Sequence, residues 1–314
     1  MRIGIDIMGG DFAPDLIVAG CIQAREQIPE DIELILLGDK ESIIRIAGDN
    51  GFDVNRISIV HTSDQINMND HPIKAFTSKM KSSIFQGFQM LRSGEIDTFC
   101  SAGNTGAMLV GASKVISPIA GIIRPGIVAR MPNFSGNPGV LIDVGLNPDA
   151  RPDVLLQYGV LGKLYSTAMF NVKEPRVGLI NIGMEEEKGN LVTKATYQLM
   201  KESNDLNFVG NVEGNGLFSN TDVDVYVCDG FNGNIILKEA EGFYKLLEKR
   251  KIHDEFFEEF NYEHYGGTPI LGICKPVIVG HGISNERAIK NMILQSIKIV
   301  ESNLIDKIKG AITE

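Results

Sequence analysis

Short glycine-rich turns that carry hydroxyl and amide side chains are the feature of this sequence best suited to chemistry. The clearest turn, "SAGNTG", contains Ser101, Gly103, Asn104, Thr105 and Gly106 between a strand-like run and a helical apolar pattern. Glycines let backbone N–H groups converge on one point, and a helix that begins there adds a partial positive charge. Such a turn can bind an anion. An ordinary capped turn, with Asn104 or Thr105 as the N-cap, explains the same residues.

Two later turns place polar side chains after other strand-like runs. "GMEEEKGN" holds a single lysine, Lys188, among acids, which suits either a lysine placed over an anion or a solvated charged turn. "DGFNGN" offers Asp229 and Asn234 where a strand passes directly into a helix. Together with the first turn, these residues indicate a site that holds an anion and works by positioning and charge stabilisation.

Two more glycine turns add candidate residues. "MGGD" brings Gly9, Gly10 and Asp11 to the end of the first strand, and "GHGISN" brings His281 to the end of a late strand. The second of these turns lacks the third glycine of GxGxxG, so dinucleotide binding has little support. The patterns GxxxxGK[ST], GxSxG and HExxH are absent from the sequence, which argues against a P-loop, a nucleophile elbow and a zincin.

The remaining reactive side chains have simpler explanations. Cys100 ends a strand-like run, but no histidine lies near it in the sequence, so we expect a small buried hydrophobic residue rather than a nucleophile. Four aspartates could hold a divalent ion, although helix caps and turn closures explain them equally well. They are Asp6, Asp11, Asp143 and Asp229. We expect neither a metal nor a cofactor.

The elements that position these turns follow a regular order. Apolar runs of strand length each end in a glycine-rich turn, and helical apolar patterns lie between most of them, as in 73–91, 154–169 and 288–299. This alternation predicts an α/β fold, a mostly parallel sheet with helices on both faces (an α/β/α sandwich). Ligands bind such folds beyond the carboxyl ends of the strands. No linker divides the chain, so we expect residues 1–314 to form one domain or two lobes around one cleft.

Composition narrows the partners and the compartment. Forty acidic and thirty basic residues give a net charge of −10, which disfavours nonspecific binding to nucleic acid. No apolar run approaches the roughly 18–20 residues of a membrane span. The start of the chain lacks a signal-peptide layout and the four cysteines are scattered, so we expect a cytoplasmic protein. Phe256, Phe257 and Phe260 are predicted to share a helical face, which we expect to pack in the core or in an oligomer seam rather than to form a partner surface.

Six motifs occur in order along the chain: "MRIGIDIMGGDFAPD", "SAGNTGAM", "LIDVGLNPDARP", "PRVGLINIGMEEEKGN", "DGFNGNIILK" and "YGGTPILG". With them the chain closely resembles the bacterial phosphate acyltransferase family of phospholipid synthesis (PlsX). The resemblance implies transfer of a fatty acyl group from acyl-carrier protein to inorganic phosphate. It also implies a homodimer with a fold like that of phosphotransacetylases and isocitrate-type dehydrogenases. The acyl phosphate product would feed a membrane acyltransferase that acylates glycerol 3-phosphate.

The family's motifs can be matched residue by residue. The lysine of its "KGN" motif falls on Lys188 and the amide of its "DGFTGN" motif falls on Asn234, and the resemblance implies that both are catalytic. "SAGNTG" matches without a change, and "MGGD" matches through its aspartate. The candidate residues for binding phosphate or the acyl donor are Gly9, Gly10, Asp11, Ser101, Gly103, Asn104, Thr105, Gly106, Asp229 and His281.

Three positions depart from the family pattern. Phe12 stands where the family has a histidine after the aspartate, so no general base is assigned there. The family's basic segment before the paired serines retains only Lys79 and Lys81. Many members carry a longer helical hairpin, linked to membrane docking, where this chain has the short, acidic segment 246–262. Peripheral membrane association is therefore left open.

The mechanism we expect begins with phosphate in the 101–106 turn, close to Lys188. One phosphate oxygen attacks the thioester carbonyl, and Lys188 and Asn234 stabilise the oxyanion. Acyl-carrier proteins are acidic, so the docking patch should be basic. Candidates on charge alone are Arg124, Arg130 and Lys275.

Three other functions stay open at this point. The first is a phosphate acetyl- or butyryltransferase that uses a coenzyme A thioester. The second is a nucleotide-linked dehydrogenase on a related fold. The third is a noncatalytic scaffold or regulatory binding module, which would turn over no thioester.

Overall fold

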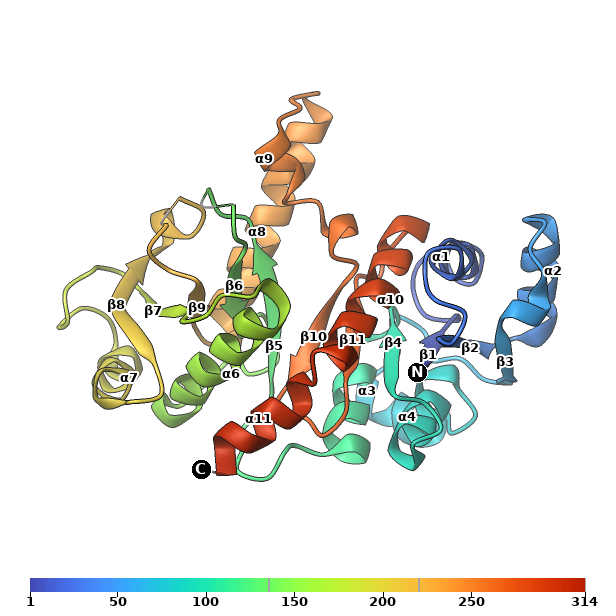
Figure 1. Cartoon of the computed structure of the whole chain (residues 1–314), viewed down its shortest axis with the longest axis horizontal. Coiled ribbons are helices and arrows are strands. Elements are labelled where there is room, and N and C mark those ends of the chain that lie inside the picture. Colours follow the sequence, from blue (N-terminus) through green and yellow to red (C-terminus); the bar gives the residue numbers. More distant parts are fainter. Residues whose placement is uncertain (135, 220, 314) are drawn as a thin grey trace. The chain divides into compact units, whose positions relative to one another are not determined.

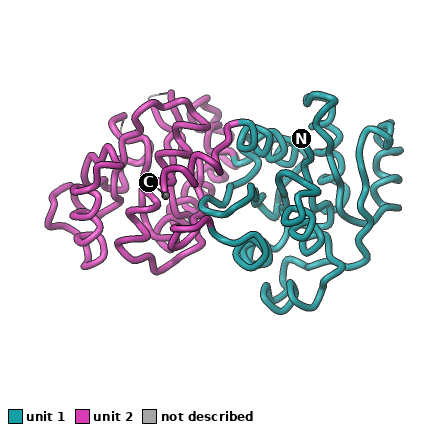
Figure 2. The backbone as a smooth tube through the Cα atoms, turned by 60° about the horizontal axis from the view of Figure 1, so that its bottom comes forward, with its two compact units in different colours: residues 1–118, 262–301 teal, residues 119–261, 302–314 magenta. Residues whose placement is uncertain are grey.

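The chain divides into two compact units that interleave in the sequence. A computed structural model describes residues 1–134, 136–219 and 221–313. Unit 1 comprises Met1–Pro118 and Tyr262–Glu301, and unit 2 comprises Ile119–Asn261 with the chain from Ser302 onward (Figure 2). Each unit has its own set of paired strands and its own helices.

The strands of unit 1 are mostly parallel and buried. Their order is β3-β2-β1-β4-β11-β10, and the pair β10–β11 is antiparallel. Asp6 of β1 and Val279 of β11 both lie opposite Ser101 of β4, so the carboxyl ends of these three strands meet at one edge. The bounds are β1 (Arg2–Asp6), β2 (Glu33–Gly38), β3 (Ser58–His61), β4 (Thr98–Ser101), β10 (Gly267–Leu271) and β11 (Val277–Gly280).

Side-chain caps start several helices of unit 1, although α1 and α3 begin without one. Asp39 accepts a hydrogen bond from Ser42 N at the start of α2, and Ser82 accepts one from Phe85 N at the start of α4. The Ser82 cap divides the expected helical stretch 73–91 into α3 and α4. The bounds are α1 (Asp15–Arg25), α2 (Lys40–Asp49), α3 (Pro72–Ser78), α4 (Ser83–Ser93), α5 (Thr105–Gly111) with a π-helical continuation (Ala112–Ile116), and α10 (Glu286–Glu301); short 3₁₀ turns cover Val54–Arg56 and Tyr262–His264.

The strands of unit 2 have the order β5-β6-β9-β7-β8. Strand β5 is antiparallel to β6, and the other neighbouring pairs are parallel. The large side chains of Tyr158, Tyr165 and Tyr226 are buried in this unit. The bounds are β5 (Gly126–Met131), β6 (Gly139–Ile142), β7 (Arg176–Asn181), β8 (Asn207–Glu213) and β9 (Val225–Val227).

The helices of unit 2 include the two longest of the described chain (Figure 1). Every helix within the described residues is too short or too polar to cross a membrane. In both units the mostly parallel strands carry helices on both faces, which confirms the predicted fold class. The bounds are α6 (Pro152–Phe170), α7 (Leu191–Glu202), α8 (Gly230–Lys249), α9 (Glu255–Glu258) and α11 (Leu304–Thr313), with a 3₁₀ turn at Gly214–Gly216.

The aromatic stretch after α8 differs from expectation. Helix α9 ends at Glu258, so the prediction that Phe256, Phe257 and Phe260 share one helical face is wrong. A backbone turn follows instead, because Asn261 N donates to the Glu258 carbonyl. The rings still form one cluster in unit 2, where Phe256 stacks on Phe134 with ring centroids 4.1 Å apart.

Candidate active site

In unit 1 a buried aspartate joins the turns that follow β1 and β4. Ser101 Oγ donates to Asp6 Oδ2 at 2.6 Å, and Gly103 N donates to Ser101 Oγ at 2.9 Å. Met8 N donates to the other Asp6 oxygen at 3.0 Å. Burial raises the pKa of the Asp6 carboxyl, and the hydrogen bond from Ser101 is the largest opposing influence. Asp6, one of the four aspartates considered for a divalent ion, thus joins two turns of the protein.

The same two turns approach each other too closely for side chains. A Cβ atom on Gly9 would overlap Asp6 Oδ2 and would lie 2.6 Å from Gly103 Cα. A Cβ atom on Gly103 would lie 3.1 Å from Gly9 Cα. Close packing of backbone against backbone therefore accounts for Gly9 of "MGGD" and Gly103 of "SAGNTG".

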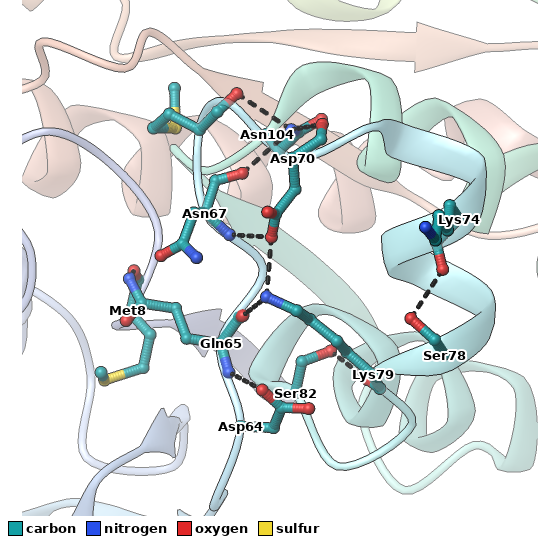
Figure 3. A network of polar contacts seen from close by, with 11 residues as sticks. Met8, Asp64, Gln65, Asn67, Asp70, Lys74, Ser78, Lys79, Ser82 and Asn104 are labelled. Carbon is teal, nitrogen blue, oxygen red and sulfur yellow. Dashed lines mark hydrogen bonds and ion pairs between the residues drawn. The ribbon is translucent and has the colours of Figure 1, made fainter.

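Asn104 uses its side chain within the protein (Figure 3). Its Oδ1 accepts from Ala107 N at 3.0 Å and caps α5. Its Nδ2 donates to three backbone carbonyl oxygens, those of Asn67 at 3.1 Å, Met68 at 3.0 Å and Asp70 at 3.0 Å. Asn104 thus holds the turn, while the neighbouring Thr105 is exposed.

The segment before α3 reaches the β1 turn through a second set of bonds (Figure 3). Lys79 Nζ donates to the Gln65 carbonyl and pairs with Asp70 Oδ2, both at 2.7 Å. Gln65 Nε2 donates to the Met8 carbonyl at 2.7 Å. The hydrogen bond from Lys79 lowers the pKa of Asp70. Of the two lysines kept from the family's basic segment, Lys79 is therefore engaged internally and Lys81 is exposed.

The other candidates of unit 1 lie at the ends of β1 and β11. Gly10 has a φ of +114°, a conformation that favours glycine. Asp11 N donates to the Gly282 carbonyl at 2.7 Å, which joins the two turns. The His281 ring lies 5.4 Å from the Tyr262 ring between centroids. Phe12, at the position of the family's histidine, is 49% exposed.

In unit 2 a second buried aspartate organises the turn after β6. Asp143 Oδ1 accepts from Ile127 N at 2.9 Å, and Oδ2 accepts from Asn147 N at 2.7 Å. Gly145 N and Leu146 N donate to the same carboxylate. Burial raises the pKa of Asp143, and these N–H groups oppose the rise. The carboxylate is saturated by its own turn and by β5.

Helix α8 begins directly against this turn. A Cβ atom on Gly233 would overlap the Asp143 carbonyl oxygen, and one on Gly230 would lie 2.8 Å from Asp143 Oδ2. Asp229 caps the helix by accepting from Asn232 N at 2.8 Å. Asn234 is exposed and donates from Nδ2 to the Val144 carbonyl at 3.1 Å. Close packing of α8 against this turn therefore accounts for Gly230 and Gly233, and the Asp229 cap begins the helix.

Lys188 lies in the exposed turn between β7 and α7. Its backbone N donates to the Glu185 carbonyl at 3.1 Å. Within the described residues no group forms a hydrogen bond or ion pair with its ammonium. The nearby Glu186 instead pairs with Lys201 at 2.8 Å, and this bond lowers the pKa of Glu186. The Lys188 ammonium is therefore available to bind an anionic ligand.

The alternative sites receive little support from the described residues. Asp6, Asp143 and Asp229 all accept hydrogen bonds from the protein, and no group of three or more His, Cys, Asp or Glu there is arranged to hold a metal ion. Cys100 is buried, as expected, and burial raises the pKa of its thiol to about 12. A thiolate nucleophile at this position is therefore disfavoured.

The candidates fall into two groups, one at strand ends of each unit. Those from the β1, β4 and β11 turns meet in unit 1, whereas Asp229, Asn234 and Lys188 follow the neighbouring strands β9 and β7 of unit 2. Two residues that shape the site were not predicted, Asn181 and Asn211. Asn181 immediately precedes "IGMEEEKGN", and that position was the only available signal.

Comparison with solved structures supports the fold. The chain is similar to a phosphotransacetylase from Streptococcus pyogenes, with a TM-score of 0.67 and 18% identity over 98% of this chain and 94% of that one. It is also similar to a branched-chain phosphotransacylase from Enterococcus faecalis, with a TM-score of 0.62 and 13% identity over 96% and 99% of the two chains. At these identities the likeness concerns the fold alone.

Comparison with sequences supports a closer relationship. The family described as fatty acid synthesis protein matches residues 1–250 and 245–307. The phosphate acyltransferase of Clostridium acetobutylicum is 39% identical over 333 aligned positions, which cover 100% of this chain and 99% of the relative. That of Acetivibrio thermocellus is 40% identical over 328 positions, which cover 98% and 96%. By these full-length matches, the chain belongs to the phosphate acyltransferase family.

Proposed function

We propose that this protein transfers a fatty acyl group from acyl-carrier protein to inorganic phosphate and forms an acyl phosphate. The observation that carries the proposal is the full-length identity of 37–40% to proteins named phosphate acyltransferases. Acyl transfer to phosphate follows from the family, and the carrier protein as donor is our further step.

The glycine turns of unit 1 bind phosphate in this proposal. The proposed donors are backbone N–H groups of these turns other than Gly103 N and Asp11 N, which already donate to Ser101 Oγ and to the Gly282 carbonyl. Internal hydrogen bonds hold both turns in place. The residues assigned to phosphate or acyl-donor binding are Gly9, Gly10, Asp11, Ser101, Gly103, Asn104, Thr105, Gly106, Asp229 and His281. Ser101, Asn104 and Asp229 act by holding the turns, since their side chains already bond to the protein.

Lys188 and Asn234 stabilise the charge that develops during the reaction. A phosphate oxygen attacks the thioester carbonyl carbon, a C–O bond forms, and the carbonyl oxygen becomes an oxyanion. The C–S bond then breaks and the carrier protein leaves as a thiolate. The ammonium of Lys188 has no protein partner among the described residues. Asn234 donates one N–H to Val144 and keeps a second for the oxyanion.

The reaction needs no general base at position 12, where this chain has an exposed phenylalanine. Phosphate is largely dianionic near neutral pH and is already a nucleophile. A thiolate also leaves more readily than an alkoxide, so acid assistance contributes little. Positioning and electrostatic stabilisation supply most of the rate.

The proposed partners follow from the same chemistry. The acidic carrier protein docks on basic side chains, for which Arg124 and Lys275 remain candidates. Arg130 is less suited, because it pairs with Glu259 at 2.5 Å. We propose a homodimer whose acyl phosphate product is consumed by a membrane glycerol-3-phosphate acyltransferase.

The direct test is phosphate-dependent release of free carrier protein from a purified long-chain acyl-carrier protein. We expect release only when phosphate is present, with acyl phosphate formed in equal amount. Sulfate in place of phosphate serves as the control. Turnover of acetyl- or butyryl-coenzyme A without turnover of the acyl-carrier protein would instead identify a phosphate acetyl- or butyryltransferase. No turnover with any thioester would indicate a binding module.

A further inference from the structure

The turn that carries Lys188 stands on two buried asparagines from neighbouring strands. Asn181 ends β7 and Asn211 lies in β8, and their side chains are almost inaccessible to solvent. Leu179 lies opposite Asn211 in the register, and Asn181, two residues later, is on the same face of the sheet. Asn181 Nδ2 donates to Asn211 Oδ1 at 3.0 Å. The two amides therefore form one buried pair.

The remaining donors of this pair hold the turn from below. Asn181 Nδ2 also donates to the Lys188 carbonyl at 3.2 Å, and Asn211 Nδ2 donates to the Glu185 carbonyl at 2.8 Å. Lys188 N closes the turn onto the same Glu185 carbonyl at 3.1 Å. Both ends of the turn 185–188 are thus bonded to amides whose own positions are set by the sheet.

The chain on either side of the turn is also fixed to this pair. Ile182 N donates to Asn181 Oδ1 at 2.9 Å. Gly189 has a φ of +95°, and a Cβ atom there would overlap the same Asn181 oxygen. Asn190 then caps α7 by accepting from Thr193 N at 2.9 Å. The backbone from strand to helix is held at each step, whereas the Lys188 side chain stays exposed.

We propose that Asn181 and Asn211 are positioning residues for the acyl transfer. They hold the turn 185–188 and thereby fix where the Lys188 ammonium stands when the oxyanion forms. This inference rests on the function proposed above for Lys188. The pair touches neither phosphate nor the acyl group and acts on the reaction through Lys188.

The test begins with Asn211→Ala, which removes the bond to the Glu185 carbonyl, and with Asn211→Asp, which keeps the acceptor for Asn181. For both variants we expect kcat to fall ~10- to 100-fold because a catalytic group is misplaced, while the KM for phosphate changes far less. Backbone amides of 182–189 should exchange hydrogen faster than in the unchanged protein. If one variant fails to fold, the other carries the test.

Asn133→Ala is the matched control. Asn133 is another buried asparagine of unit 2, and its side chain bonds to Tyr226 rather than to the Lys188 turn. We expect it to lower Tm about as much as Asn211→Ala does and to leave kcat within about twofold. Equal losses of kcat in both variants would show a general effect of instability and would overturn the inference.

The double variant Lys188→Ala/Asn211→Ala separates positioning from structure. If Asn211 acts only through Lys188, the double variant has the kcat of Lys188→Ala alone. Losses that multiply would contradict the inference. Full activity of Lys188→Ala would remove Lys188 from the mechanism, and the proposed positioning role would fall with it. Faster exchange at 182–189 in Asn211→Ala would then still show that the pair holds the turn, which traces the failure to Lys188.

Discussion

The two units share one structural feature, a buried aspartate at the carboxyl end of a strand, and differ in the groups to which that aspartate bonds. Asp6 is the last residue of β1, and Asp143 directly follows β6. Each carboxylate collects hydrogen bonds from the turn that follows it. Asp6, however, also bonds to Ser101 and so joins turns from two strands, whereas Asp143 is saturated by its own turn and by Ile127 of the adjacent strand.

The two regions also differ in what they present to solvent. In unit 1 the side chains of Ser101 and Asn104 bond to other groups of the protein, and Gly9 and Gly103 pack backbone against backbone. In unit 2 the side chains of Lys188 and Asn234 are exposed on a firmly held base. Unit 1 therefore offers main-chain geometry and unit 2 offers functional groups. Substitutions that add atoms should therefore disrupt the turns of unit 1, and substitutions that remove atoms should lower activity by removing the functional groups of unit 2.

The largest effect is expected where an atom is added between the turns of unit 1. Gly9→Ala places a methyl group onto Asp6 Oδ2 and against Gly103, so the turns must separate. We expect a loss of ~1–3 kcal/mol in the free energy of unfolding and a loss of most activity. Urea unfolding and the acyl phosphate assay measure both.

Gly48→Ala is the control for that substitution. Gly48 lies in α2, and a Cβ atom there would meet nothing within 4 Å. Alanine at a helical position with free space should stabilise the protein by ~0.5–1 kcal/mol and leave activity unchanged. A Gly9→Ala protein as stable and active as this control would contradict the close packing of the two turns.

The second effect comes from removing a functional group in unit 2. Lys188→Ala and Asn234→Ala should each lower kcat about 10²–10³-fold, as the loss of one oxyanion donor does elsewhere. Because both side chains are exposed, Tm should hardly change. Lys194→Ala, an exposed lysine on α7, is the matched control and should keep its activity. A fall in Tm large enough to explain the lower kcat would show that these two residues act through stability. It would contradict the difference proposed between the two units.

A third, smaller effect should separate the two tasks of Asn104. Asn104→Asp keeps the oxygen that caps α5 but turns a second oxygen toward the carbonyls of residues 67, 68 and 70. Asn104→Ala loses both functions, and loss of the cap alone costs ~1 kcal/mol. We expect both variants to raise the KM for phosphate and only the alanine variant to lose the cap energy. An unchanged KM for phosphate in both variants would show that the contact with residues 67–70 does not affect phosphate binding by the 101–106 turn.

The smallest effect is a pH dependence in unit 1. The hydrogen bond from Lys79 lowers the folded pKa of Asp70, so its stabilising contribution is complete above the ordinary carboxyl pKa. The contribution is lost as the pH falls through the lowered folded value. Asp70→Asn should therefore narrow the difference in Tm between neutral and acid solution. A wild-type slope retained in this variant would assign the acid sensitivity to other carboxyls.

Much of the fold could be predicted because it depends on local pattern. Apolar runs that end in glycine turns marked the carboxyl ends of β1, β4, β7 and β9, where the candidate residues lie. The break between α3 and α4 was missed, since apolar spacing continues through it, although α3 ends at Ser78 and Ser82 caps the next helix. The end of α9 before Phe260 was missed for a similar reason: the apolar spacing continues although the helix does not.

The supports of the site were less predictable than its exposed groups. Lys188 and Asn234 stand out by type and motif, but Asn181 and Asn211 come together only through the register of β7 and β8. In the same way, Asn104 suggested an anion donor until residues 67–70, distant in sequence, placed three carbonyls against it. Bonds between distant segments leave no periodic trace in a single sequence.

The amide base of the Lys188 turn has a consequence for how the protein responds to its medium. Neutral hydrogen bonds hold that turn, and mobile ions screen exposed charges far more than they weaken buried neutral bonds. Rising ionic strength should therefore weaken the capture of an anionic substrate without disturbing the alignment of the group that receives it. The attraction of Lys188 for its substrate and the position of Lys188 therefore depend on separate sets of interactions.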